Sequence, residues 1–85
     1  MNITIDCSSI LGREDLHRIF AQTLSFPAWY GNNLDALHDQ LTSLSGTIRL
    51  ENWATAEERL GKYGLSVKRV ILHAALENEK LIVVL

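Results

Sequence analysis

The sequence predicts an α/β fold that combines a three-stranded parallel sheet with four helices in the order β-αα-β-αα-β. Three short apolar segments lie near the beginning, the middle and the end of the 85-residue chain, and two longer stretches with helical periodicity separate them. These stretches, about 40 and about 30 residues long, suffice for the right-handed crossovers that parallel strands require. The last segment, "LIVVL", lacks polar residues, which is typical of a strand buried on both faces.

The composition is that of an ordinary globular protein. Hydrophobic residues make up 47% and charged residues 21% of the chain, and a net charge of −2 gives no general attraction to nucleic acid or membranes. Cys7 is the only cysteine, which excludes an intramolecular disulfide and favours a reducing cytoplasm; we expect it to be a small buried side chain. No signal peptide, membrane span or phosphate-binding glycine loop is recognisable. We expect one domain over residues 1–85, monomeric when free and without a cofactor or metal.

The first strand and the first helix follow from periodicity. Residues 2–6, "NITID", alternate apolar and polar side chains as a strand does. From Glu14 to Leu24 apolar residues recur at helical spacing, and the polar residues, His17 among them, fall mostly on the opposite face. We therefore expect His17 to be exposed to solvent. Pro27 prevents the helix from continuing.

A second amphipathic helix is predicted from about Asn33 to Leu44. Its apolar stripe consists of Leu34, Leu37, Leu41 and Leu44. Asn32 or Asn33 can cap it, because a side-chain amide oxygen accepts hydrogen bonds from the free N–H groups of the first turn. Gly46 is expected to close it in a left-handed conformation.

A second strand and a third helix follow. Residues 47–52, "TIRLEN", have the alternation of a short strand, with two inward side chains, Ile48 and Leu50. Residues 53–63 suit a helix, in which Thr55 and Glu58 have the spacing of a capping box.

A fourth helix is expected to begin at Ser66, with Asn78 as its stop. The residues on its apolar face are Val67, Val70, Ile71 and Ala74. The chain then ends in the "LIVVL" strand, which should pair in parallel because helices supply the connections.

Three polar residues share one face of the second helix: Asp35, His38 and Asp39. Asp35 lies near the N-terminus and gains from the helix dipole, so a structural role stays open for it. Asp39 lies one turn later, where that benefit has faded, and repulsion from Asp35 costs an isolated helix about 0.2–0.5 kcal/mol. A cationic partner would account for the pair. The three side chains could also hold a divalent metal in a small metal-dependent enzyme, although no H-E-x-x-H pattern or cysteine cluster supports that alternative.

Trp29 and Tyr30 stand just before this helix. Because successive side chains of an extended segment point in opposite directions, we expect Tyr30 to pack inward and Trp29 to face solvent. An exposed aromatic next to acidic side chains has the composition of a binding hot spot. This part of the sequence favours a protein-binding surface.

The segment "YGNNLDALHDQL", residues 30–41, resembles the second-helix signature of the barstar family, intracellular inhibitors of barnase-type ribonucleases. The segment "EDLHRIF", the stretch from Leu50 to Trp53 and the final apolar strand resemble further parts of that family, so the resemblance covers most of the chain. It implies the same β-αα-β-αα-β order and no catalytic activity. It also implies that the second helix and the loop before it plug the active site of a basic ribonuclease.

The resemblance implies roles for particular residues. Asp39 would be the central mimic of an RNA phosphate and Asp35 the second acidic contact. Trp29 would pack on the enzyme, where the family commonly has a tyrosine, while Gly31 and Asn33 would shape the loop. The expected partner-binding set is Trp29, Gly31, Asn33, Asp35, His38, Asp39, Thr42, His73 and Glu77.

Two histidines depart from the family pattern. His38 stands where the family has a tryptophan, and His73 falls near a position that presents a glutamate, while Glu77 keeps the next acidic contact. Protonation of these histidines at acidic pH would add positive charge facing a basic partner. The departures leave a second interpretation open, a module of the same fold that binds a different basic protein.

Overall fold

The computed structural model describes residues 1–85 and has the predicted β-αα-β-αα-β order. Its elements are β1 (Asn2–Asp6), the 3-10 helix η1 (Cys7–Ser9), α1 (Arg13–Thr23), α2 (Leu34–Leu41), β2 (Gly46–Glu51), α3 (Trp53–Leu60), α4 (Lys62–Glu77) and β3 (Leu81–Val84). The predicted fold class is thus confirmed. None of the helices is both long enough and apolar enough to cross a membrane.

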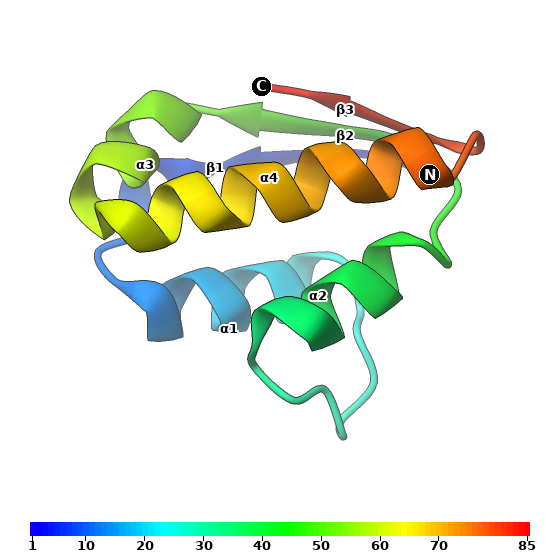
Figure 1. Cartoon of the computed structure of the whole chain (residues 1–85), viewed down its shortest axis with the longest axis horizontal. Coiled ribbons are helices and arrows are strands. Elements are labelled where there is room, and N and C mark those ends of the chain that lie inside the picture. Colours follow the sequence, from blue (N-terminus) through cyan, green and yellow to red (C-terminus); the bar gives the residue numbers. More distant parts are fainter.

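The sheet is parallel throughout, and β2 lies in its centre between β1 and β3. Ile48 of β2 aligns with Ile3 on one side and with Val83 on the other. Figure 1 shows α1, α2 and α4 on the same side of the sheet, with α3 at the end where β2 stops. The helices therefore cover one face of the sheet and leave the other face without a helical layer.

One apolar cluster of 17 buried residues fills the space between the sheet and the helices. The sheet contributes Ile5, Ile48 and Leu50 to it, and α2 contributes Leu37 and Leu41. Burial of each such side chain stabilises the fold by roughly 1.5–3 kcal/mol. The two leucines hold α2 in place, so the opposite face of this helix is free for other contacts.

α2 is shorter than predicted, since it ends at Leu41 instead of Leu44. Side chains donate hydrogen bonds to the carbonyl groups at its C-terminal end. The Thr42 hydroxyl donates to the Asp39 carbonyl at 2.9 Å. Asn78 Nδ2 donates to the carbonyls of Leu41 and Leu44 at 3.1 and 2.7 Å. These bonds replace the hydrogen bonds that another helical turn would have made.

Gly46 does not close α2, contrary to the prediction. It begins β2 with a φ of 125°. A Cβ at this position would lie 2.0 Å from the carbonyl oxygen of Met1. The glycine is therefore required by the close approach of the first residue of the chain, which only the folded arrangement reveals.

The capping box predicted at Thr55 and Glu58 is also wrong. α3 already begins at Trp53, and its N-cap is Asn52 in the left-handed region with a φ of 59°. The Trp53 side chain is buried in the core. Burial of this large aromatic thus determines where the helix begins, ahead of the local capping pattern.

α4 begins at Lys62, well before the expected Ser66, and contains Gly64 in its first turns. Gly64 is buried, and a Cβ there would lie 2.6 Å from the carbonyl oxygen of Glu57 on α3. The glycine therefore allows the backbones of α3 and α4 to approach each other closely, and it lies within α4. The predicted stop at Asn78 is confirmed.

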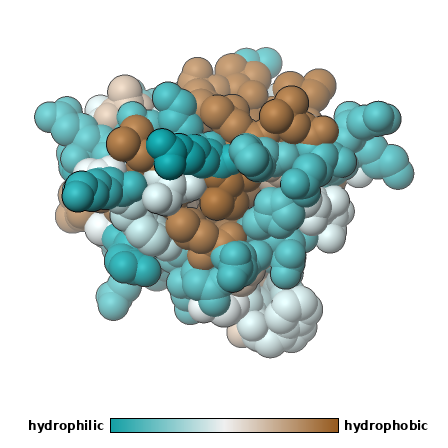
Figure 2. All heavy atoms as spheres, viewed as in Figure 1, coloured by the Kyte–Doolittle hydropathy of each residue, from teal (hydrophilic) through white to brown (hydrophobic).

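The prediction that the last strand is buried on both faces is wrong. β3 pairs in parallel with β2, as expected, but it lies at the sheet edge. Leu81 points into the core, whereas Ile82 is 59% exposed. Figure 2 shows hydrophobic atoms gathered at the top of the molecule, where β3 lies in Figure 1. The apolar run reflects β-propensity on a half-covered edge strand.

Candidate functional site

The loop before α2 is tied to the helix by one asparagine. Asn33 is the N-cap, with an extended φ of −139°, and its Oδ1 accepts a hydrogen bond from the Ala36 N–H at 2.8 Å. Its Nδ2 donates to the Gly31 carbonyl at 3.2 Å. A Cβ on Gly31 would lie 3.0 Å from that nitrogen, so a side chain there would crowd the turn. Of the two candidates for the cap, Asn33 is confirmed, and it links Gly31 to the first turn.

Two carboxylates project from the exposed face of α2. Asp35, in the first turn, has no side-chain hydrogen bond or ion pair within the chain. The Asp39 side chain is 81% exposed, and its carboxylate lies 3.7 Å from Nδ1 of His38. Solvent is the main partner of both groups, so both are free to accept hydrogen bonds from a bound cation.

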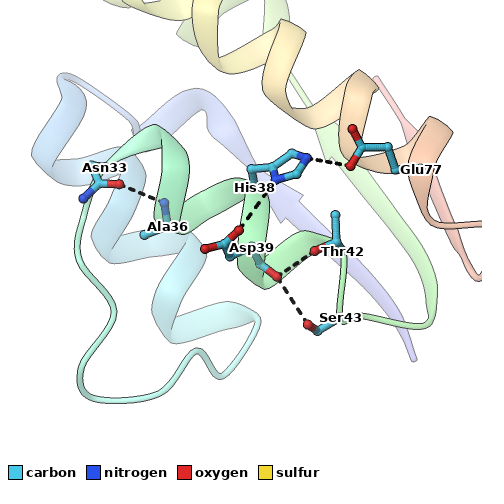
Figure 3. A network of polar contacts seen from close by, with 7 residues as sticks. All are labelled: Asn33, Ala36, His38, Asp39, Thr42, Ser43 and Glu77. Atoms are coloured by element: carbon cyan, nitrogen blue, oxygen red, sulfur yellow. Dashed lines mark hydrogen bonds and ion pairs between the residues drawn. The ribbon is translucent and has the colours of Figure 1, made fainter.

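A histidine bridge joins α2 to α4. Nε2 of His38 lies 2.9 Å from Oε2 of Glu77, and Figure 3 shows the two side chains meeting between the helices. Thr42 lies on the same side of α2, where its hydroxyl is engaged with the Asp39 carbonyl. The structure therefore brings His38, Asp39, Thr42 and Glu77 into one neighbourhood. Thr42 caps the helix end here.

A hollow of about 270 Å³ lies between α2 and α4. Its lining residues are Asp35, His38, Arg69, Val70 and His73. His73 thus lies next to the acidic face, as expected. Arg69 was missed by the sequence reasoning, although it stands one turn before His73, on the same face of α4 as His73 and Glu77. The i, i+4 spacing of Arg69 and His73 could have indicated from the sequence that Arg69 belongs to this surface.

Trp29 and Tyr30 point in opposite directions, as predicted. Trp29 is 78% exposed at the tip of the loop, while Tyr30 is buried and packs on Phe26, with ring centroids 4.8 Å apart. The loop thus exposes the large Trp29 ring to solvent, and the buried Tyr30 side chain next to it anchors the loop backbone in the core.

His17 is buried, contrary to the prediction that it is a surface residue; only 2% of it is exposed. Its Nδ1 lies 2.6 Å from the Tyr30 hydroxyl and its Nε2 2.7 Å from the Tyr63 hydroxyl. Both ring nitrogens thus have partners, which is what allows a polar ring to be buried. We call His17, Tyr30 and Tyr63 the histidine hub. It connects α1, the loop before α2 and α4.

Burial sets the acid–base properties of the hub. It lowers the pKa of His17, and the neighbouring Arg13 lowers it further. It raises the pKa of Tyr30 to about 12, with a contribution from Tyr63. The Arg13 guanidinium lies 4.2 Å from the centroid of the Tyr63 ring. These shifts favour a neutral His17 beside a neutral Tyr30 hydroxyl group.

The alternative of a catalytic or metal site finds no support in the geometry. No three His, Cys, Asp or Glu side chains are placed so that they could hold a metal ion. Cys7 is buried, as expected, and burial raises the pKa of its thiol to about 11, with the Asp6 charge adding to the effect. A thiol with so high a pKa is a poor nucleophile.

The fold and this surface define a class of protein, a small parallel α/β domain that exposes an acidic helix next to an aromatic loop. The chain matches the family described as Barstar (barnase inhibitor) over residues 1–85. It is also 40% identical over 78 residues to a Bacillus subtilis (strain 168) protein named "Putative ribonuclease inhibitor YrdF", and the match covers 88% of this chain and 86% of that protein. The chain therefore belongs to the barstar family. Because the family consists of inhibitors, the chain is not an enzyme.

Proposed function

We propose that this protein binds a basic, barnase-type ribonuclease and blocks its active site with α2 and the loop before it. The observation that carries the proposal is the pair of exposed carboxylates, Asp35 and Asp39, one turn apart on a helix whose other face is fixed in the core. Family membership supports a ribonuclease as the partner.

The physical basis is imitation of RNA phosphates. A nuclease cleft that binds RNA is lined with cations, and a carboxylate can accept paired hydrogen bonds from an arginine much as a phosphate does. Asp39 would occupy the central phosphate position and Asp35 the next one. Because α2 is held by Leu37 and Leu41, little conformational entropy is lost when the carboxylates bind.

Trp29 would supply the apolar part of the interface. Its exposed ring can pack on the rim of the cleft, while Gly31 and Asn33 keep the loop in shape. His38, Thr42, His73 and Glu77 would form the remaining edge of the surface, next to α4. Tryptophan is among the residues most often found at the energetic centre of protein interfaces.

We further propose that the protein is monomeric when free and acts in the cytoplasm, protecting the cell that makes the ribonuclease. The single buried thiol and the absence of disulfides are suited to a reducing compartment. The net charge of −2 supports a protein partner over direct binding to nucleic acid.

Isothermal titration against barnase-type ribonucleases, together with an RNA-cleavage assay, tests the proposal. We expect one-to-one binding and loss of cleavage at equal concentrations. Asp39→Ala should weaken binding by at least about 100-fold, since removing one member of a buried charge pair costs about 3–5 kcal/mol and each 1.4 kcal/mol is tenfold in affinity. Glu58→Ala, which removes an exposed carboxylate from α3, is the matched control and should bind as wild type.

A second candidate function is binding of a different basic protein through the same surface. It is favoured by the positions of Arg69 and His73, which make the α4 side of the surface less acidic than the α2 side. If no ribonuclease binds, but Asp39→Ala abolishes capture of another basic protein at an unchanged melting temperature, this alternative holds.

A further inference from the structure

Arg69 places a cation next to the acidic face of α2, and no carboxylate of the chain neutralises it. Its side chain lines the hollow between α2 and α4 together with Asp35 and His73. It makes no ion pair within 4.0 Å, and its guanidinium donates no hydrogen bond to another side chain. Asp35, in the same hollow, is equally unpaired.

The charges on the α4 side follow one helical stripe. Arg69, His73 and Glu77 are spaced at i, i+4 and i+8, and Glu77 is already engaged by His38 at 2.9 Å. The free charges of the surface are therefore anionic on α2 and cationic at Arg69 on α4. A partner with only cationic groups in its interface would be attracted by the carboxylates on α2 and repelled by Arg69 on α4.

We propose that Arg69 is a specificity-determining residue that selects ribonucleases carrying an aspartate or glutamate on the rim of their basic cleft. The inference rests on the proposed function. A partner that covers α2 also covers the hollow and removes water from Arg69. A guanidinium keeps its charge, so it needs an acceptor when it is buried, and a carboxylate matches its planar pair of N–H donors.

The test compares binding of wild type, Arg69→Ala and Arg69→Glu by isothermal titration to barnase-type ribonucleases inactivated by substitution of the catalytic base. We expect Arg69→Ala to weaken binding at least about 10-fold and Arg69→Glu at least about 100-fold. Arg49→Glu is the matched control. Arg49 is exposed and unpaired on β2, and the substitution changes the net charge by the same amount. It should leave the affinity within about two-fold of wild type.

Charge reversal on the enzyme completes the test. Replacing one acidic rim residue of the ribonuclease by lysine should restore tight binding to Arg69→Glu and weaken binding to wild type. Thermal melting of each free variant verifies that its fold is intact, as expected for an exposed side chain.

Four outcomes are distinguishable. Equal or tighter binding by Arg69→Ala overturns the inference and leaves ribonuclease inhibition standing. The same conclusion follows if double-mutant cycles show that Arg69 couples to Asp35 and to no acidic residue of the enzyme, because Arg69 would then act by holding Asp35 in place. Rescue by charge reversal supports the inference. Failure of the wild type to bind any of the ribonucleases overturns the proposed function and the inference together.

Discussion

Nδ1 of His17 lies 2.6 Å from the hydroxyl of Tyr30, inside the core and across 13 positions of the chain. Tyr30 is the direct neighbour of Trp29, so this hydrogen bond connects the folded core with the loop that presents the exposed tryptophan. The second bond of the imidazole, to Tyr63 at 2.7 Å, adds α4 to the same hub. The histidine hub thus holds the proposed binding loop to the core through Tyr30.

Tyr30→Phe is expected to destabilise the fold by about 1–3 kcal/mol, because it leaves a buried ring nitrogen of His17 without a partner. Urea unfolding followed by circular dichroism measures the change. Tyr63→Phe should have a similar effect through the other nitrogen. If Tyr30→Phe matched wild type in unfolding free energy, the hub would contribute nothing to stability.

The stability of the protein should fall as the pH is lowered below about 6.5, the ordinary pKa of histidine. Burial lowers the pKa of His17 in the folded state, so between that value and 6.5 the unfolded chain binds a proton that the folded chain does not. The free energy of unfolding therefore rises with pH across this window. The contribution of His17 to stability is lost as the pH falls through the lowered pKa. Urea titrations at several pH values measure this slope for wild type and for His17→Gln. An equal slope in the variant would assign the effect to other groups.

Gly64→Ala should destabilise the fold by roughly 1–3 kcal/mol, because its Cβ would lie 2.6 Å from the Glu57 carbonyl oxygen and the backbones of α3 and α4 would have to separate. Gly12→Ala is the matched control, since a Cβ at Gly12 meets nothing within 4 Å. Melting temperatures of the two variants give the comparison. A smaller loss for Gly64→Ala than for Gly12→Ala would show that the helices are not packed in this way.

Features that depend on neighbouring residues along the chain could be predicted. The bounds of β1, a cap at Asn32 or Asn33 and the opposite directions of Trp29 and Tyr30 follow from alternation, helical spacing and capping chemistry within a few residues. The two carboxylates on one face of α2 follow from their spacing, because one turn of helix separates them.

Features that depend on distant partners were missed. The sequence places His17 on a polar face, and only the fold brings Tyr63, from 46 positions away, to satisfy its second nitrogen. Ile82 looks like a core residue until the strand order leaves β3 at an edge. Arg69 becomes part of the candidate site only because α4 packs next to α2.

Periodicity and capping patterns in the chain therefore suffice to predict the order of the elements and the acidic helix that the proposed function needs. The packing of the elements adds that His17 is buried, that His38 bridges to Glu77, and that Arg69 shares the hollow with Asp35. The physical reason is that periodicity tells which side chains share a face of one element. Whether a polar group can be buried, or a charge stay unpaired, depends on groups from other elements that only folding brings within hydrogen-bond distance.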